Sequence, residues 1–227
     1  MKNPKYLVEQ ADIDYALNST PWDLGNQVLY DMCAAHPQHP THQEVVSKVW
    51  LIGRSYAAAI ERRKNKKNES DKFYEEIVGP GICNSDLDKL LSNLPASPAD
   101  AIVSVASAII THKEVTNLFN RLAKMEKRSL ASKYLHFHRP DIFFIYDARA
   151  QTAINKLTPD CRYIDCINIP ETERDEWYYK FCVRACWLIR HIKDTFHQML
   201  TPRQIDKVLL NVNRRIRISE PSLASDE

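Results

Sequence analysis

The stretch Ser129-Leu-Ala-Ser-Lys-Tyr-Leu-His-Phe-His-Arg-Pro-Asp-Ile-Phe-Phe-Ile-Tyr-Asp147 decides how the rest of the chain is interpreted. Its first half carries apolar side chains at helical spacing, and Pro140 ends that helix because proline lacks an amide hydrogen. Residues 142–146 are a continuous apolar run, too short for a typical helix, so we expect a buried extended connector. Asp147 occupies the position of an N-cap for the helix that follows. The stretch therefore predicts Lys133 on one helix and Asp147 at the start of the next.

Length and composition predict an ordinary globular protein. The chain has 227 residues, 44% of them hydrophobic, and a formal net charge of +2. It contains no apolar run of the roughly 18 residues that a membrane helix needs, so we expect no membrane association. The first residues lack the apolar segment of a secretory signal, which leads us to expect a cytoplasmic protein with its six cysteines as thiols.

Charge is distributed unevenly along the chain. Residues 121–139 carry six basic side chains against one acidic side chain, Glu126. Because phosphates are held by clustered lysine and arginine side chains, this segment is a candidate track for nucleic acid.

Caps and prolines punctuate the whole chain at helical intervals. They predict helices over about residues 4–17, 21–35, 41–63, 70–78, 85–91, 97–109, 113–124, 129–138, 148–154, 172–196 and 201–215. No strand-like alternation or repeat period is present. The predicted fold is an all-α protein of about ten helices, with residues 1–218 as a single domain and residues 219–227 as a disordered tail. A cleft could divide the domain into lobes 1–95 and 96–218.

The run SLASKYLHFHRPDIFFIYDARAQTAI resembles the core of the helix-hairpin-helix DNA glycosylases, which include endonuclease III. The resemblance implies an all-α enzyme that removes a modified or damaged base from DNA, for repair or for defence against foreign DNA. It places Lys133 at the nucleophilic lysine of that family and Asp147 at its catalytic aspartate. The family's Gly-x-Gly turn is missing here, and the spacing of 14 residues between lysine and aspartate is shorter than usual.

The two residues suit this chemistry without any family. Cleavage of a glycosidic bond builds positive charge on the sugar, which a nearby carboxylate stabilises. A lysine amine of lowered pKa can attack C1′ of the sugar and form a Schiff base, which would add lyase activity. The alternative is structural, with Asp147 only a helix cap and Lys133 a solvated surface lysine.

The predicted contacts to DNA surround this pair. Lys127, Arg128 and Ser129, at the start of the helix, would replace the missing glycine turn through side chains and the helix dipole. His136 and His138 are further candidates, as phosphate or base contacts or, alternatively, as ordinary hydrogen-bonded histidines. The full predicted set for nucleic-acid binding is Lys127, Arg128, Ser129, His136, His138, Arg139 and Arg149.

Two other functions stay open at this stage. One is a non-catalytic nucleic-acid-binding module on the same scaffold, and the other is an α-helical ribonuclease or toxin that uses Arg184 and His191. We predict no metal and no cofactor, because the separations of 5, 16 and 4 residues among Cys161, Cys166, Cys182 and Cys186 do not match a four-cysteine cluster loop. The target base, the strand preference and the oligomeric state are left undetermined.

Overall fold

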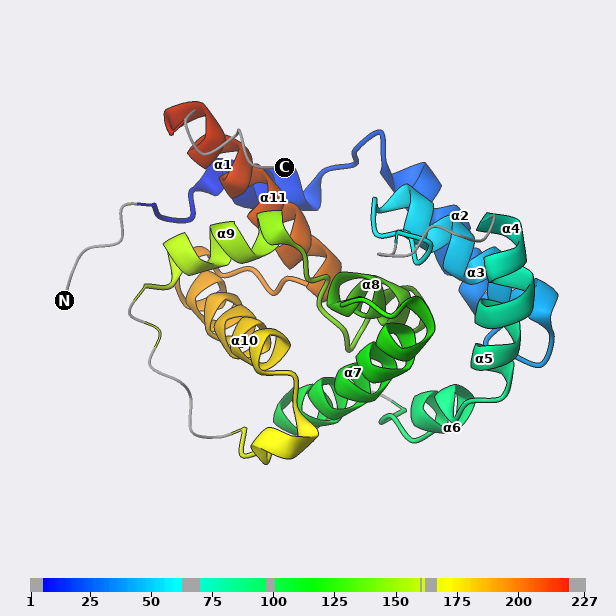
Figure 1. Ribbon diagram of the computed structural model, residues 1–227. Helices are drawn as coiled ribbons and strands as arrows, with labels where there is room; N and C mark the ends of the chain where they lie inside the picture. Colours follow the sequence, from blue (N-terminus) through cyan, green and yellow to red (C-terminus); the bar gives the residue numbers. More distant parts are fainter. Residues whose placement is uncertain (1–5, 63–69, 97–100, 160, 162–166, 221–227) are drawn as a thin grey trace.

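The computed structural model describes residues 6–62, 70–96, 101–159, 161 and 167–220, and their regular structure is helical (Figure 1). The helices are α1 (Gln10–Leu17), α2 (Asp23–Ala35), α3 (His42–Ser55), α4 (Ser70–Phe73), α5 (Gly79–Cys83), α6 (Leu87–Ser92), α7 (Ala101–Ala123), α8 (Arg128–His138), α9 (Ala148–Leu157), α10 (Glu176–Phe196) and α11 (Pro202–Ser219). A π-helical turn spans Tyr74–Val78, and a 3₁₀ turn spans Glu171–Glu173. The all-α prediction is confirmed. None of the described helices is long and apolar enough to cross a membrane.

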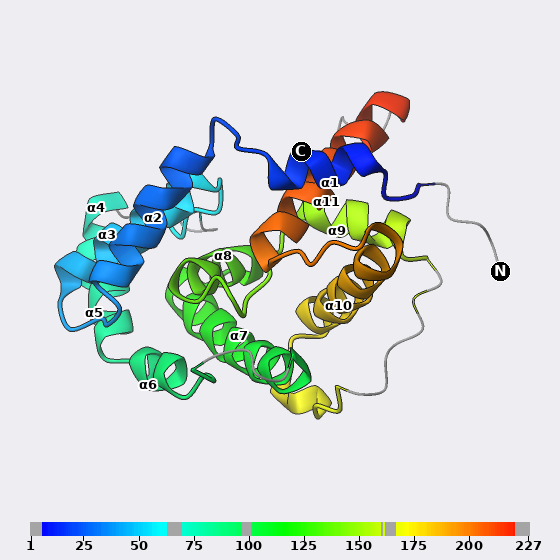
Figure 2. The same ribbon diagram turned by 180° about the vertical axis from the view of Figure 1, so that it is seen from behind.

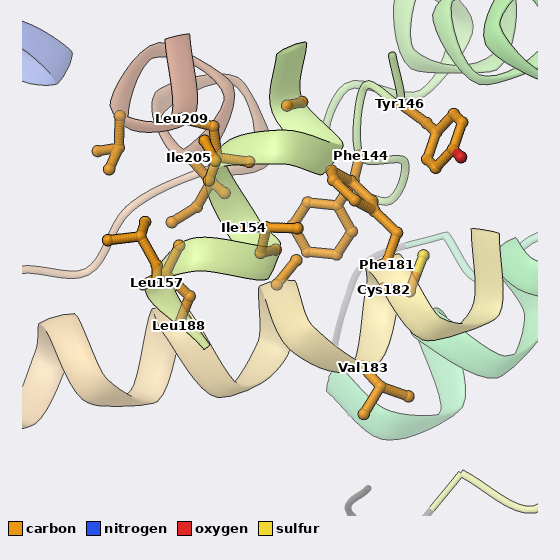
Figure 3. Close-up of a cluster of buried hydrophobic side chains, with 14 of the residues drawn as sticks. Phe144, Tyr146, Ile154, Leu157, Phe181, Cys182, Val183, Leu188, Ile205 and Leu209 are labelled. Atoms are coloured by element: carbon orange, nitrogen blue, oxygen red, sulfur yellow. The ribbon is translucent and has the colours of Figure 1, made fainter. Parts of the chain in front are cut away.

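The described residues form two hydrophobic cores, and the apolar side chains of α8 belong to the second of them. Helices α1, α9, α10 and α11 surround the first, which we call the α9–α11 core and which Figure 3 shows in close-up. Helices α2, α3, α5, α6, α7 and α8 enclose the second, the α3–α8 core. Figures 1 and 2, seen from opposite sides, both show α8 with α9–α11 on one side and α2–α5 on the other.

The two cores divide the chain differently from the predicted lobes 1–95 and 96–218. Ile13 of α1 belongs to the α9–α11 core, although it lies near the start of the chain. Helix α7 contributes Ile109 to that core and Phe119 to the α3–α8 core, so it joins both. The boundary therefore follows packing and not the order of the sequence.

The connector between α8 and α9 is buried over residues 142–146, as its apolar run predicts, and it begins with a turn in which the Ile142 and Phe143 amides donate to the Arg139 carbonyl. Ile142 and Phe143 pack into the α3–α8 core, whereas Phe144 and Tyr146 pack into the α9–α11 core (Figure 3). A continuous apolar run is what such a segment needs, because both of its sides are covered by protein.

Several helix boundaries differ from the predictions. Helix α1 begins at Gln10, where Glu9 and Asp12 form a capping box, and residues 6–9 are not helical. Helix α3 ends at Ser55 instead of continuing to residue 63, because the chain reverses at Ala57, whose φ is 51°.

The most instructive differences are two places where a predicted break is absent. Helix α7 runs unbroken through residues 111–113, where His112 is buried and stacks on Tyr178 of α10 at 3.6 Å between ring centroids. Gly79-Pro80-Gly81 is helical in α5 and does not end a helix. A Cβ at Gly81 would lie 2.4 Å from Leu122 Cδ2, so a larger residue there would require the Leu122 side chain of α7 to move.

Some predicted core and tail residues also lie elsewhere. Leu24 and Val28 of α2 were expected on its apolar stripe, but they are 78% and 57% exposed. The predicted tail begins inside α11, because that helix includes Ser219, whose hydroxyl is 2.7 Å from the hydroxyl of Tyr6. The remainder of the predicted tail, residues 221–227, falls outside the described residues.

Candidate active site

The Lys133 side chain lies inside the protein, at the junction of the two cores. Its residue is 3% exposed, so the solvated surface lysine considered from the sequence is wrong. The ammonium donates to the backbone carbonyl of Tyr56 at 3.2 Å and to Ser129 Oγ at 3.0 Å. It also lies 5.7 Å from the centroid of the Tyr56 ring. A buried ammonium with these contacts is held in one position.

Asp147 is the N-cap of α9, as the sequence predicts. Its Oδ1 accepts a hydrogen bond from the Ala150 amide at 2.9 Å. Its Oδ2 lies 3.5 Å from Lys133 Nζ and 3.6 Å from an Arg149 nitrogen. The carboxylate thus uses one oxygen for the helix and turns the other toward two cations.

A hydrogen-bonded bridge explains why Lys133 and Asp147 meet although 14 residues separate them. Ser132 is the neighbour of Lys133. Its Oγ accepts a hydrogen bond from the Tyr146 amide at 3.0 Å and donates to the Tyr146 carbonyl at 3.2 Å. Tyr146 directly precedes Asp147. The bridge therefore fixes the end of the connector beside the middle of α8.

Helix α11 adds an ion pair that was not predicted from the sequence. Arg203 pairs with Oδ2 of Asp206, which is 3% exposed. Oδ1 of Asp206 is buried and has no hydrogen-bond partner among the residues that the structure describes. The charges of Asp147, Lys133 and Arg149 act on Asp206, so we group all five side chains as one electrostatic cluster. We call Lys133, Asp147, Arg149, Arg203 and Asp206 the junction site.

The pKa values of the three central groups shift in different directions. Burial lowers the pKa of Lys133, although Asp147 opposes this effect. Burial alone would raise the pKa of Asp147, but Lys133, the Ala150 amide and Arg149 together hold it below its usual value. Burial raises the pKa of Asp206 to about 6, with Arg203 opposing the shift and Asp147 adding to it. The site therefore combines an ionised carboxylate, a carboxyl that protonates easily and an amine that loses its proton more easily than usual.

Two predicted DNA contacts are structural residues in this arrangement. The Lys127 ammonium is buried and donates to the carbonyl of Ala59 at 3.0 Å and to that of Arg62 at 2.5 Å. His136 is fully buried, with Nδ1 donating to the Phe143 carbonyl at 2.8 Å and Nε2 lying 2.7 Å from the Tyr30 hydroxyl. A phosphate contact by either side chain stays a prediction, and it would require the side chain to leave these internal partners.

Three more of the predicted contacts are engaged within the protein. Arg128 donates to Asp175 at 2.6 Å, and Arg139 donates to the Pro95 carbonyl at 2.6 Å. His138 donates through Nδ1 to the Tyr134 carbonyl at 2.9 Å, and burial lowers its pKa to about 3. A role for these three in DNA binding is still a prediction, and it would require them to exchange these partners.

Of the predicted contacts to nucleic acid, Arg149 belongs to the junction site, and Ser129 contacts the site through Lys133. Arg149 is half exposed, at 50% of its side chain, and is the member of the junction site best placed to meet a ligand from solvent. Ser129 accepts from Lys133, so it supports the amine from within α8.

The Arg184 and His191 pair of the ribonuclease alternative is also engaged internally. Arg184 donates to the carbonyl of Thr158 at 2.8 Å and to its hydroxyl at 3.0 Å. His191 stacks on Trp187 at 5.1 Å between centroids. Both contacts are ordinary packing of α10 and do not favour that function.

A second buried polar cluster lies in the α3–α8 core. His39 Nδ1 lies 2.5 Å from Asp88, and His39 Nε2 lies 2.6 Å from the Tyr134 hydroxyl. This chain ties the loop before α3 to α6 and α8. Every polar atom of the His39 ring has a partner, so the cluster is a structural clamp.

Asp206 and Arg203 were missed because their signal in the sequence is weak. Asp206 lies within the helical pattern of Ile205, Leu209 and Val212, where a single acidic residue is usually solvated at the edge of an apolar stripe. Only the packing of α11 against α9 reveals that it is buried.

Comparison with known proteins adds nothing to this geometry: no family model, no curated protein and no solved structure matches the chain.

Proposed function

We propose that the protein is a DNA glycosylase-like enzyme that releases a modified or damaged base by cleaving its N-glycosidic bond. The observation that carries the proposal is the pair of buried Lys133 and partly buried Asp147 at 3.5 Å, which joins the two residues that the glycosylase resemblance singles out. DNA is the expected partner, and repair or defence against foreign DNA is the expected role.

Asp147 would stabilise the positive charge that forms on the sugar as the base departs. Its pKa is held below the usual value, so the carboxylate is ionised at neutral pH. It is also fixed by the α9 cap, and a fixed charge needs no reorganisation during the reaction.

Lys133 would attack C1′ of the sugar. Its lowered pKa increases the fraction of neutral amine, which is the nucleophilic form. As the amine bonds to C1′, the electron pair of the glycosidic bond leaves with the base, which takes the proton that the amine gives up. The C1′–O4′ bond then breaks, O4′ takes a proton from water, and a protonated Schiff base between Lys133 and the DNA remains.

The non-catalytic alternative is less well supported, because it depends on an open basic track over residues 121–139. Of its six basic side chains, Lys127 and Lys133 are buried, and Arg128 and Arg139 are paired with carboxylates. Arg121 and Lys124 are the ones left exposed. Two exposed cations make a weak phosphate track.

The test uses duplex and single-stranded oligonucleotides that each carry one modified base. The wild type should leave an abasic site on at least one of them, and borohydride should trap a covalent adduct. Peptide mapping should place the adduct on Lys133 and not on Lys48. Lys48 is the control because it is another buried lysine of lowered pKa. Its ammonium is held by two backbone carbonyls and has no carboxylate within ion-pair distance among the described residues.

Two outcomes would change the proposal. Base release without trapping would make water the attacking group and leave Lys133 a binding role. A wild type that neither releases a base from any member of the panel nor binds any of the oligonucleotides would remove the proposal altogether.

A further inference from the structure

A cavity of about 310 Å³ lies between the end of α5, helix α6 and helix α7. Figures 1 and 2 both show α6 between the other two helices. None of the residues that line the cavity belongs to the junction site, so the glycosylase function proposed above does not account for it. Its volume is at the lower end of the range for small-molecule sites, which is about 300–1,000 Å³.

Leucines form the apolar part of the lining. Leu87 and Leu90 come from α6, and Leu118 and Leu122 come from α7. Gly81 of α5 has no side chain to fill the space, and its backbone packs closely against Leu122. Because the burial of apolar surface against such a lining is favourable, the cavity suits a ligand with an apolar body.

Three charged side chains also line the cavity, and all three are available to a ligand. Asp86, Glu114 and Arg121 are exposed, and within the part of the chain that the structure describes their side chains make no ion pair and no hydrogen bond. Asp86 is the N-cap residue of α6, but its carboxylate does not bond to the helix. Ser85 Oγ accepts from the Leu87 amide at 3.3 Å instead. The lining therefore offers two carboxylates and one guanidinium that have no partner in these segments.

The acid and the base on α7 stand at opposite ends of one wall of the cavity. Glu114 and Arg121 are seven residues apart, which is two helical turns, so they share one face of α7 and lie about 10 Å apart along its axis. Leu118 lies between them on the same face. This wall is therefore negative at one end, apolar in the middle and positive at the other end.

We propose that the cavity is a binding site for a short apolar peptide with free termini. The peptide ammonium faces Glu114, the peptide carboxylate pairs with Arg121, and the apolar side chains pack on the leucines. Arginine suits this role because its guanidinium can bind a carboxylate through two parallel hydrogen bonds. An extended chain spans at most about 3.3–3.6 Å per residue, so three residues match the distance of about 10 Å between the two charged ends.

Other small ligands match less of the lining. A free amino acid carries both of its charges next to one carbon and cannot reach both ends of the wall, and an aliphatic amine leaves Arg121 without a partner. Asp86 gives the lining an excess of negative charge, so the ammonium of the peptide should contribute more to binding than its carboxylate does.

The experiment measures the binding of trileucine to the full chain by isothermal titration calorimetry. Trileucine should bind with a dissociation constant below about 1 mM. N-acetylation removes the ammonium and should weaken binding by about tenfold or more, whereas C-terminal amidation removes the carboxylate and should weaken it by about three- to tenfold. Dileucine spans only about 7 Å and should bind more weakly than trileucine.

Two variants connect each end of the peptide to one residue of the protein. Glu114→Gln should weaken trileucine binding and remove the effect of N-acetylation, and Arg121→Gln should do the same for C-terminal amidation. The matched controls are Glu75→Gln and Arg217→Gln, which change exposed residues of the same types outside the cavity and should leave the affinity unchanged. All four positions are exposed, so we expect these variants to fold as the wild type does.

Methyl NMR locates the bound peptide. Titration with trileucine should shift the methyl signals of Leu118 and Leu122 and leave those of Leu188 and Leu209, in the α9–α11 core, in place. Absence of trileucine binding, equal binding of the free and the acetylated peptide, or shifts confined to leucines outside the cavity would each overturn the proposal. The glycosylase proposal stands or falls separately, because the measured quantity here is peptide binding and not base release.

Discussion

Asp147 and Asp175 each cap a helix, but their carboxylates face different basic side chains. Asp147 caps α9 through the Ala150 amide at 2.9 Å, and Asp175 caps α10 through the Tyr178 amide at 2.9 Å. Each also faces a basic side chain of α8. Asp175 lies 2.6 Å from Arg128 Nε, whereas Asp147 lies 3.5 Å from Lys133 Nζ.

The difference is in how fully each pair is satisfied. A distance of 2.6 Å is a short charge-assisted hydrogen bond, and Arg128 has Glu126 as a second partner at 3.4 Å. At 3.5 Å the contact between Lys133 and Asp147 is looser, and the ammonium directs its bonds to Tyr56 and Ser129 instead.

The identity of the cation deepens the contrast. Arginine stays protonated at any relevant pH, so Arg128 and Asp175 form a permanent clamp. Lysine can give up its proton when buried, and the pKa of Lys133 is already lowered. A helix-capping carboxylate next to a cation is therefore a structural clamp when both groups have all their hydrogen bonds to fixed partners. It is a candidate active site when one of the two groups can change its charge.

The largest expected effect is on catalysis. Asp147→Asn should keep the α9 cap through its amide oxygen but remove the negative charge, so base release should fall by roughly 10²–10³-fold. Asp175→Asn should leave base release within about threefold of the wild type, since its carboxylate belongs to the clamp. Rates on one cleavable oligonucleotide measure both. Equal rates for the wild type and Asp147→Asn would remove Asp147 from the mechanism and erase the distinction between the two aspartates.

The next effect is on stability, where we expect the larger loss for Asp175→Asn and the smaller loss for Asp147→Asn. Asp175→Asn should lower the free energy of unfolding by about 1–3 kcal/mol, because the partly buried Arg128 guanidinium loses its main partner and cannot lose its proton. Asp147→Asn should cost less, since Lys133 keeps two acceptors and can lose its proton. Urea unfolding at neutral pH measures both values. A larger loss for Asp147→Asn would mean that the Lys133 pair is the structural clamp.

Acid unfolding should show both aspartates at once. The pKa of each carboxyl is held below its ordinary value, so each stabilises the fold fully above the unfolded-state pKa of about 3.9. That contribution is lost as pH falls through the lower folded-state pKa. The stability gap between the wild type and either Asp→Asn variant should therefore narrow as pH is lowered from 6 toward 3, in urea titrations at a series of pH values. A gap that stays constant over this range would contradict the lowered pKa values.

What could be predicted from the sequence is what local chemistry determines. Pro140 and Asp147 set the end of α8 and the start of α9, and Thr201 with Gln204 forms the capping box of α11. These signals act within a few residues, so no knowledge of packing is needed to interpret them.

What could not be predicted depends on packing between distant segments. Gly81 resembles a helix terminator in sequence, yet it is helical and packs closely against Leu122 of α7. Lys127 resembles a phosphate contact in sequence, yet its ammonium donates hydrogen bonds to two backbone carbonyls of the loop after α3. Asp206 has only a weak local signal, because its burial comes from the packing of α11 against α9.

The smallest expected effect tests how the Lys133 amine is held. Ser129 Oγ accepts from the ammonium at 3.0 Å, which favours the charged form. Ser129→Ala removes one hydrogen bond of about 0.5–1.5 kcal/mol, so the pH at which borohydride trapping is half maximal should move down by about one unit or less. Thr152→Ala, which removes an exposed hydroxyl bonded to the Ala148 carbonyl on α9, should leave that pH unchanged. A shift to higher pH, or no shift, would mean that Ser129 does not set the charge of Lys133 and that burial and the charge of Asp147 control it instead.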